Sequence, residues 1–337
     1  MHSFVPSLEE VSPSWLGSVL TEPSPPSSID NFEFKRVGEA YGFASRIFRF
    51  SWQEHRQAKS VIIKFWKLNT TADANELRFY QTFKALGVRT PAFLYGAHDS
   101  EKAILILEDL GFAEQGDVLK PLSLTEAKTV ARSLAVLHSE WVEHPQLYQD
   151  WIIDLSSWNP DATWIKERRS EFLERFPNHL SQQALSLLNN LEIALPITSK
   201  RLASAPDTLL HGDFHLDNLL FEKNTPIFLD WSRPARGAAS YNLVHLLFMM
   251  TSTTYFDDIL KTYLRVYQNR ASLNYQECLS HLGGSLLHLF TQSTCGVARW
   301  KPSLARAKDI LKDGISRVNH MVAFWHKRDP TFFDFLS

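Results

Sequence analysis

Cysteine and net charge are both scarce in this sequence. Only two of the 337 residues are cysteines, Cys278 and Cys295, which excludes a disulfide framework or a thiolate zinc site and leads us to expect a reducing, cytoplasmic setting. Lys and Arg number 35 against 37 Asp and Glu, a formal net charge of -2. That balance gives no overall electrostatic field to recruit nucleic acid or an anionic membrane.

Long apolar runs are also missing. The most apolar stretch, NLVHLLFMM at 242–250, is far shorter than the roughly 20 residues that span a bilayer. The first residues, MHSFVPSLEEV, lack the basic start and apolar run of a signal peptide. What is present is an ordinary globular balance of 44% hydrophobic and 21% charged residues. We therefore expect a protein with neither a nucleic-acid partner nor a membrane partner.

The chain divides into three parts. Residues 1–30 predict a short helical arm followed by a Pro- and Ser-rich tether, TEPSPPSSID. Residues 31–110 carry alternating or apolar runs typical of an antiparallel sheet and one helical stretch, DANELRFYQTFKAL, with Gly87 where a C-cap belongs. Residues 111–337 have mostly helical periodicity, beginning with a capping box at Ser123. The sequence thus predicts an α+β fold with a small sheet lobe and a larger helical lobe.

The stretch LLHGDFHLDNLLF at 209–221 interrupts the helical part with strand-loop-strand character. It contains Asp213 and Asn218, and Asp230 follows at the end of the apolar run PIFLD. An aspartate base, a downstream asparagine and a strand-borne aspartate form the phosphoryl-transfer pattern of the kinase fold. Asp213 would orient an attacking hydroxyl and accept its proton, while Asn218 and Asp230 offer the hard oxygen ligands that Mg²⁺ prefers.

A zinc-dependent hydrolase is a second interpretation of the same stretch, with His211, Asp213 and His215 as metal ligands. Alternate residues share a face only while the segment stays extended, and no HExxH helix accompanies them. We favour histidines that hold the loop. His211 would then bond to backbone or to a nearby carboxylate, and His215 would lie near the phosphates.

Two upstream features fit a nucleotide site. Lys64 ends the apolar run SVIIK and Glu76 lies in the following helical stretch; in a kinase-like lobe such a lysine grips the α- and β-phosphates and the glutamate holds it. VGEAYGFAS places Gly38, Gly42 and Ser45 between two predicted strands, and glycines allow backbone N–H groups to approach phosphate closely. Because this stretch does not match G-x-G-x-x-G, an ordinary hairpin remains the alternative.

HGDFHLDN followed by FLDW resembles the Brenner-type motif of the aminoglycoside phosphotransferase and choline kinase superfamily. LILEDLG, LAVLHSEW and GFASRIFRF are similar to its ecdysteroid-kinase-like branch and bacterial relatives, and the resemblance covers about residues 31 to 250. It implies a bilobal protein-kinase-like fold with ATP and Mg²⁺ in the cleft and Asp213 as the catalytic base. It also implies that the adenine lies against the lobe connection at Glu108, Asp109 and Leu110.

One departure from that family concerns Asn242. Many relatives carry an aspartate in this segment, and if that residue braces the catalytic loop, Asn242 keeps the hydrogen bond but not the charge. His138, in LAVLHSEW, is expected to be a structural residue of a helix.

The predicted activity is transfer of the ATP γ-phosphate to a hydroxyl of a small molecule, held by the helical lobe around 150–170 and 240–300. No Ala-Pro-Glu follows Asp230, which disfavours a protein substrate. WIIDLSSWNPDATW offers an aromatic wall, so a weakly charged, partly apolar alcohol is favoured as the acceptor, although these tryptophans equally suit packing between helices. A nucleotide-binding pseudokinase without turnover is the alternative from another functional class.

Overall fold

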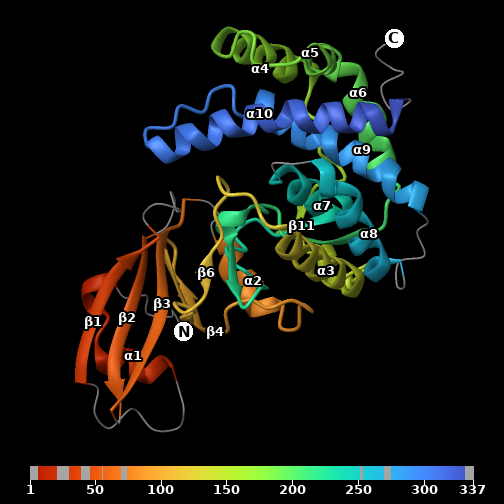
Figure 1. Cartoon of the computed structure of the whole chain (residues 1–337). Coiled ribbons are helices and arrows are strands. Elements are labelled where there is room, and N and C mark those ends of the chain that lie inside the picture. The colour runs from red at the N-terminus through yellow and green to blue at the C-terminus, as the bar shows by residue number, and fades with distance from the viewer. Residues whose placement is uncertain are drawn as a thin grey trace.

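The computed structural model describes residues 7–20, 30–38, 46–54, 56–69, 74–250, 253–268 and 275–330. Within them the chain forms a small sheet lobe and a larger, mostly helical lobe, which confirms the predicted α+β, protein-kinase-like division (Figure 1). The small lobe is drawn in the red and orange colours at the start of the range, and the long helix α10 (Ala305–Arg328) runs across the helical lobe.

The small lobe is built around an antiparallel sheet of order β1-β2-β3-β5-β4. Side chains alternate between its two faces. In β3, Val61 and Ile63 are buried on one face, whereas Ile62 and Lys64 line a cleft on the other. The elements of this lobe are β1 (Asp30–Val37), β2 (Arg46–Glu54), β3 (Gln57–Lys67), α2 (Asn75–Thr82), β4 (Phe93–His98) and β5 (Lys102–Glu108).

The predicted N-terminal helix is present as α1 (Pro13–Val19), after a short turn η1 (Leu8–Glu10). The Ser12 hydroxyl caps it by accepting a hydrogen bond from Trp15 N at 3.1 Å. Leu16 is fully buried against the face of the sheet opposite the cleft, and Trp15 meets Tyr95 edge to face. The outer face of the sheet is therefore covered. The tether at 21–29 lies outside the described residues.

Helix α2 is shorter than predicted, and the prediction that Gly87 is its C-cap is wrong. The helix ends at Thr82, and Phe83 is already extended. Phe83 leaves the helical path because its ring packs edge to face on Trp141, with centroids 4.9 Å apart. Gly87 has φ +73°, and a Cβ there would lie 2.1 Å from the Glu140 carboxylate. Gly87 is needed instead for its positive φ, in the segment between α2 and β4.

The helical lobe contains the predicted helices and more strands than predicted. Two small sheets, of order β10-β9-β6 and β7-β11-β8, flank the loop at 211–218, which is the predicted catalytic loop. Their strands β6, β7 and β11 were not expected, because segments of two to four residues show no clear alternation. The helices are α3 (Leu124–Glu140), α4 (Ala162–Arg175), α5 (Gln182–Asn189), α6 (Leu191–Leu202), α7 (Ser240–Phe248), α8 (Phe256–Tyr267), α9 (Tyr275–Thr291) and α10 (Ala305–Arg328), with short turns η3 (Pro145–Tyr148), η4 (Leu216–Asn218), η5 (Thr253–Tyr255) and the π-helical η6 (Gln292–Gly296). The strands are β6 (Glu114–Gln115), β7 (Ile153–Asp154), β8 (Asp207–Leu210), β9 (Leu219–Glu222), β10 (Thr225–Phe228) and β11 (Ala235–Ala238).

The two lobes are joined at more than the connection after β5. Arg89 forms a parallel β-bridge with Ile227 of β10, and Phe228 N donates to Arg89 O at 2.9 Å. Phe79 of α2 stacks on Trp231, with centroids 4.2 Å apart and an interplanar angle of 7°. Since Trp231 directly follows Asp230, these contacts fix the small lobe against the end of β10.

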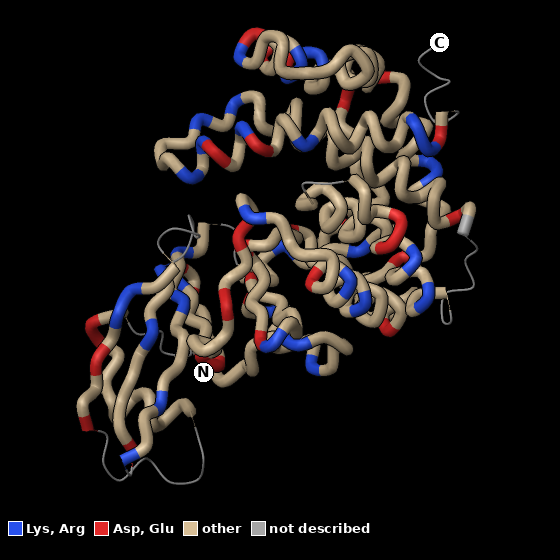
Figure 2. Tube along the Cα trace, viewed as in Figure 1, with Lys and Arg blue, Asp and Glu red and all other residues tan. Residues whose placement is uncertain are grey.

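Acidic and basic residues are interspersed over both lobes, and neither sign is confined to one of them (Figure 2). None of the helices in the described ranges is both long and apolar enough to cross a membrane.

Candidate active site

Lys64 and Glu76 form an ion pair inside the small lobe. Lys64 Nζ lies 2.7 and 2.6 Å from the two Glu76 carboxylate oxygens, and both residues are buried. Burial alone lowers the pKa of Lys64, but attraction to Glu76 and Asp230 outweighs it and raises the pKa above its usual value. Lys64 is thus a cation held on the cleft face of β3 by a carboxylate on α2.

Asp230 faces this lysine from the other lobe. Its Oδ2 lies 3.8 Å from Lys64 Nζ, and its Oδ1 is buried with no hydrogen-bond partner in the described part of the chain. Burial raises the pKa of Asp230, but the charge of Lys64 and a hydrogen bond from Ser232 outweigh it, so the pKa is held below its usual value. An ionised carboxylate with an unpaired buried oxygen is a suitable ligand for a hard cation.

The predicted catalytic loop, residues 211–218, is held by contacts with backbone groups just before Asp213. Gly212 has φ +74°, and a Cβ there would lie 1.6 Å from the Arg233 carbonyl oxygen, so only glycine fits. His211 is fully buried, and its Nε2 donates to Leu229 O at 2.7 Å. His211 therefore ties the loop to the residue that precedes Asp230, which is one of the two roles predicted for it.

Asn218 lies at the end of this loop with its amide orientation fixed. Its Nδ2 donates to the Asp213 backbone carbonyl at 2.9 Å and lies 3.0 Å from His215 Nε2. The amide carbonyl oxygen is left available for a cation. His215 Nε2 is 3.7 Å from Asp213 Oδ2. Burial raises the pKa of Asp213, but His215, His211 and Arg233 outweigh it and keep the pKa below its usual value.

A cavity of about 300 Å³ between the lobes brings most of the predicted residues together. Lys64 and Ile62 line it from β3, and Tyr80 lines it from α2. Asp213 and His215 do not line it; they contact Asn218 at its edge. Gly42 and Ser45 lie outside the described residues. The predicted residues in the lining are Gly38, Lys64, Glu76, Glu108, Asp109, Leu110, Asn218 and Asp230.

Comparison with known proteins identifies the family. The sequence profile of the phosphotransferase enzyme family matches residues 42–278, more than half of the chain. The chain belongs to that family. No curated protein sequence matches it.

Solved structures of the same fold are similar over most of the chain at low identity. The microcompartment-associated aminopropanol kinase has a TM-score of 0.57 at 15% identity, covering 89% of this chain and 94% of that one. Choline kinase LicA from Streptococcus pneumoniae gives 0.53 at 14%, covering 87% and 95%. The amicoumacin kinase hAmiN gives 0.55 at 10%, covering 87% and 90%. The predicted superfamily is confirmed; its ecdysteroid-kinase-like branch stays a prediction.

In this phosphotransferase, Asn242 does contact the catalytic loop. Its Oδ1 accepts hydrogen bonds from His211 N and from His138 Nε2, both at 3.2 Å. His138 Nδ1 lies 2.7 Å from the Tyr263 hydroxyl, and the histidine is fully buried, as expected for a structural residue. The brace therefore works through a neutral amide.

Two ion pairs at the phosphotransferase cleft were not predicted. Arg49 of β2 holds Asp109 through Nε at 2.6 Å, and Arg306 of α10 binds both oxygens of Asp217, at 2.7 and 2.8 Å. Asp217 directly precedes Asn218, so α10 helps to fix the end of the catalytic loop. These partners are 60 and 89 residues apart in the chain, and no local pattern signals such pairs.

The zinc-hydrolase interpretation finds no support in the geometry. The described ranges contain no group of three His, Cys, Asp or Glu side chains suited to a metal. His211 points to a backbone carbonyl instead.

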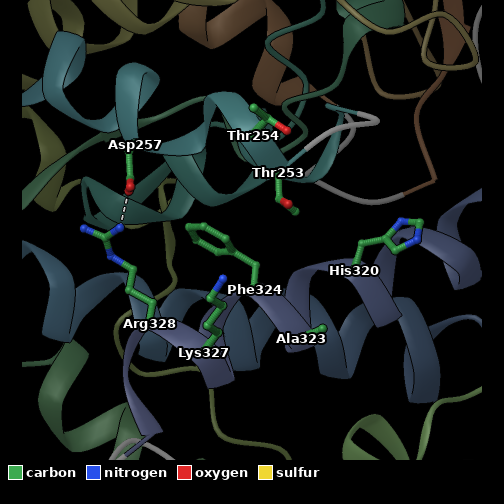
Figure 3. A pocket seen from close by; sticks show the side chains of 8 residues that line it. All are labelled: Thr253, Thr254, Asp257, His320, Ala323, Phe324, Lys327 and Arg328. Atoms are coloured by element: carbon green, nitrogen blue, oxygen red, sulfur yellow. Dashed lines mark hydrogen bonds and ion pairs between the residues drawn. The ribbon is translucent and has the colours of Figure 1, made fainter.

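A second cavity, of about 700 Å³, lies away from the catalytic loop, between the start of α8 and the end of α10 (Figure 3). Asp257 is paired with Arg328 there, and Phe324 and His320 come from the same face of α10. It contains none of the predicted site residues.

Proposed function

We propose that this chain is an ATP-dependent phosphotransferase that transfers the γ-phosphate to a hydroxyl of a small-molecule acceptor. The observation that carries the proposal is the 3.8 Å approach of Lys64 Nζ to Asp230 Oδ2 across the cleft. A lysine from the sheet lobe and a carboxylate from the helical lobe face the same cavity as Asn218. This is the arrangement that a metal–polyphosphate needs.

The roles follow from charge. Lys64, held by Glu76, would bind the α- and β-phosphates, and Gly38 with Gly42 and Ser45 would cover them from the small lobe. Asn218 and Asp230 would hold Mg²⁺, which supplies charge neutralisation at the phosphate oxygens when bound. The adenine would lie against Glu108, Asp109 and Leu110, and His215 would lie near the phosphates.

Asp213 would act as the base. The acceptor oxygen forms its bond to the γ-phosphorus while the bond from that phosphorus to the bridging oxygen breaks; ADP leaves and the hydroxyl proton passes to Asp213. Because its pKa lies below the usual value, Asp213 is ionised at neutral pH and can accept that proton.

The solved relatives support this assignment at the level of fold and ligand class. The amicoumacin kinase was solved with AMP-PNP and Ca²⁺, a nucleotide and a divalent cation. We also propose a cytoplasmic protein, since Cys278 and Cys295 are both free and buried. The functional boundaries are proposed at 1–30 for the arm, 31–110 for the nucleotide lobe and 111–337 for the catalytic and acceptor lobe.

The test is to measure Mg²⁺-dependent ATP consumption and nucleotide binding for wild type and Asp213→Ala. The variant is expected to lose turnover and keep nucleotide affinity, since the base is removed and the cleft is not. Asp309→Ala, an exposed carboxylate on α10, is the matched control. Wild-type protein that binds nucleotide but shows no Mg²⁺-dependent turnover would favour the pseudokinase alternative.

A further inference from the structure

Helix α7 lies along the catalytic loop. At one end, Asn242 Oδ1 accepts from His211 N at 3.2 Å; at the other, the Met249 sulfur accepts from Leu216 N at 3.1 Å. Positions 242 and 249 are two helical turns apart and share a face, and His245 lies between them on that face. His245 is therefore directed at the loop segment between 211 and 216, which carries Asp213.

The ring of His245 presents a hydrogen-bond acceptor. Its Nδ1 lies 2.8 Å from the Tyr241 carbonyl oxygen, which can only accept, so Nδ1 carries the proton. In the neutral ring, Nε2 then has a free lone pair, and within the described part of the chain it makes no hydrogen bond. Burial lowers the pKa of His245, against the opposing charge of Asp213, and His215 and His211 lower it further. The half-buried ring is neutral at pH 7.

A positive charge lies close to Asp213. The Cβ of Arg233 is 3.3 Å from where a Cβ of Gly212 would be, and Arg233 lowers the pKa of Asp213. Arg233 is exposed and pairs with no carboxylate in the described residues. An ammonium group would therefore be repelled from this side of the loop.

The side chains packed next to His245 form a neutral aromatic cluster, of which Tyr241 and His288 are buried. Tyr241 lies beside it with ring centroids 5.0 Å apart, and the Tyr241 hydroxyl accepts from Gln292 Nε2 at 3.0 Å. His288 meets Tyr241 edge to face and stacks on Trp158 at 3.7 Å. Gln292 begins the π-helical turn η6, a feature frequent at functional sites. Trp158, one of the tryptophans in the predicted aromatic wall at 151–164, thus belongs to this cluster.

Resting on the proposed function, we propose that His245 is an acceptor-binding residue and that the acceptor is an uncharged compound with two neighbouring hydroxyl groups. One hydroxyl donates to Asp213 and is phosphorylated. The second donates to Nε2 of His245. A cationic amino alcohol is disfavoured because the guanidinium of Arg233 lies beside the base.

The first test is phosphoryl transfer from radiolabelled ATP to five probes. Glycerol, ribose and myo-inositol represent uncharged polyols, and choline and kanamycin represent cationic alcohols. We expect transfer to at least one polyol with a higher kcat/KM than to either cation. Preferred transfer to choline or kanamycin would overturn the proposal. So would failure of all polyols while Mg²⁺-dependent ATP hydrolysis persists, an outcome that leaves the phosphotransferase assignment standing. Loss of all ATP turnover would instead contradict the proposed function.

The second test separates binding from structure. His245→Ala should raise the KM for the polyol by about 3- to 10-fold, the loss of one neutral hydrogen bond, with the KM for ATP unchanged. His245→Gln, which restores an acceptor oxygen, should recover most of that loss. His320→Ala, an exposed histidine at the second cavity, is the matched control (Figure 3). An unchanged acceptor KM in His245→Ala, or equal rises in both KM values, would overturn the role of His245.

Discussion

Lys64 and Glu76 form a bidentate, buried ion pair whose lysine also lies 3.8 Å from Asp230. The pair connects β3 to α2, and Asp230 connects both to the helical lobe. Removing one partner of such a pair leaves an uncompensated charge in the interior.

Lys64→Met should therefore weaken both the fold and nucleotide binding. We expect a loss of about 3–5 kcal/mol in the free energy of unfolding, the usual range for breaking a buried pair from one side. Affinity for ATP should fall as well, because the phosphates lose a cation. Urea denaturation and calorimetric titration measure the two effects. Lys59→Met, on the same strand but with its exposed lysine paired to Glu54, should change stability by about 0–1 kcal/mol. Unchanged ATP affinity in Lys64→Met would contradict the phosphate role.

Asp230→Asn isolates the charge of the metal ligand. Asp230 has φ +55°, a left-handed conformation that asparagine tolerates, so the backbone should be retained. Affinity for Mg·ATP is expected to fall by about tenfold or more, since a charged hard ligand is replaced by a neutral one. Affinity for metal-free ATP should fall less. Titrations with Mg²⁺ and with EDTA distinguish the two, and an equal loss in both would argue against a metal role.

Gly212→Ala should displace the catalytic loop. An alanine there has an unfavourable positive φ and a Cβ only 1.6 Å from the Arg233 carbonyl oxygen, so backbone must move. We expect kcat to fall by far more than nucleotide affinity, measured by steady-state kinetics and titration. Gly314→Ala is the matched control: nothing lies within 4 Å of its Cβ position in α10, and removing a helical glycine should stabilise the protein by about 0.5–1 kcal/mol. Normal turnover in Gly212→Ala would show that the loop tolerates the shift.

His138 should make the protein less stable in mild acid. Burial lowers its pKa to about 4 in the folded state, against 6.5 for the exposed group. The neutral histidine's contribution is therefore complete above pH 6.5 and is lost as the pH falls from 6.5 towards 4. Between pH 7 and pH 5 this amounts to about 2 kcal/mol of unfolding free energy. In urea denaturation, His138→Gln should therefore lose about 2 kcal/mol less unfolding free energy than wild type between pH 7 and pH 5. The control variant His320→Gln, at an exposed histidine, should lose as much as wild type. Parallel pH dependences for wild type and His138→Gln would be evidence against a buried neutral imidazole.

The cleft could be predicted from the sequence because its chemistry demands particular residue types in a fixed order. A lysine that ends the apolar run SVIIK, an asparagine five positions after an aspartate, and another aspartate that ends the apolar run PIFLD can all be recognised in the sequence itself. The apolar run SVIIK predicted a strand there, and the structure places Lys64 on its cleft face with Ile62. At these positions the residue types and the local strand pattern both indicate the same nucleotide site.

Other features depend on which distant segments meet. Arg306 reaches Asp217 only because α10 returns to the catalytic loop, and the carboxylate of Asp109 is held by Arg49 from another strand. The end of α2 was misplaced because Phe83 packs better on Trp141 than along its own helix. Tertiary packing outweighs helical periodicity there, and a single sequence does not show it.

The backbone hydrogen bond between Arg89 O and Phe228 N gives the small lobe a direct hold on the strand that leads to Asp230. A rotation of the small lobe that keeps the Phe228–Arg89 hydrogen bond must therefore move β10 with it. Closure of the two lobes over a nucleotide would then also position the Asp230 carboxylate, because the same backbone hydrogen bond links both movements.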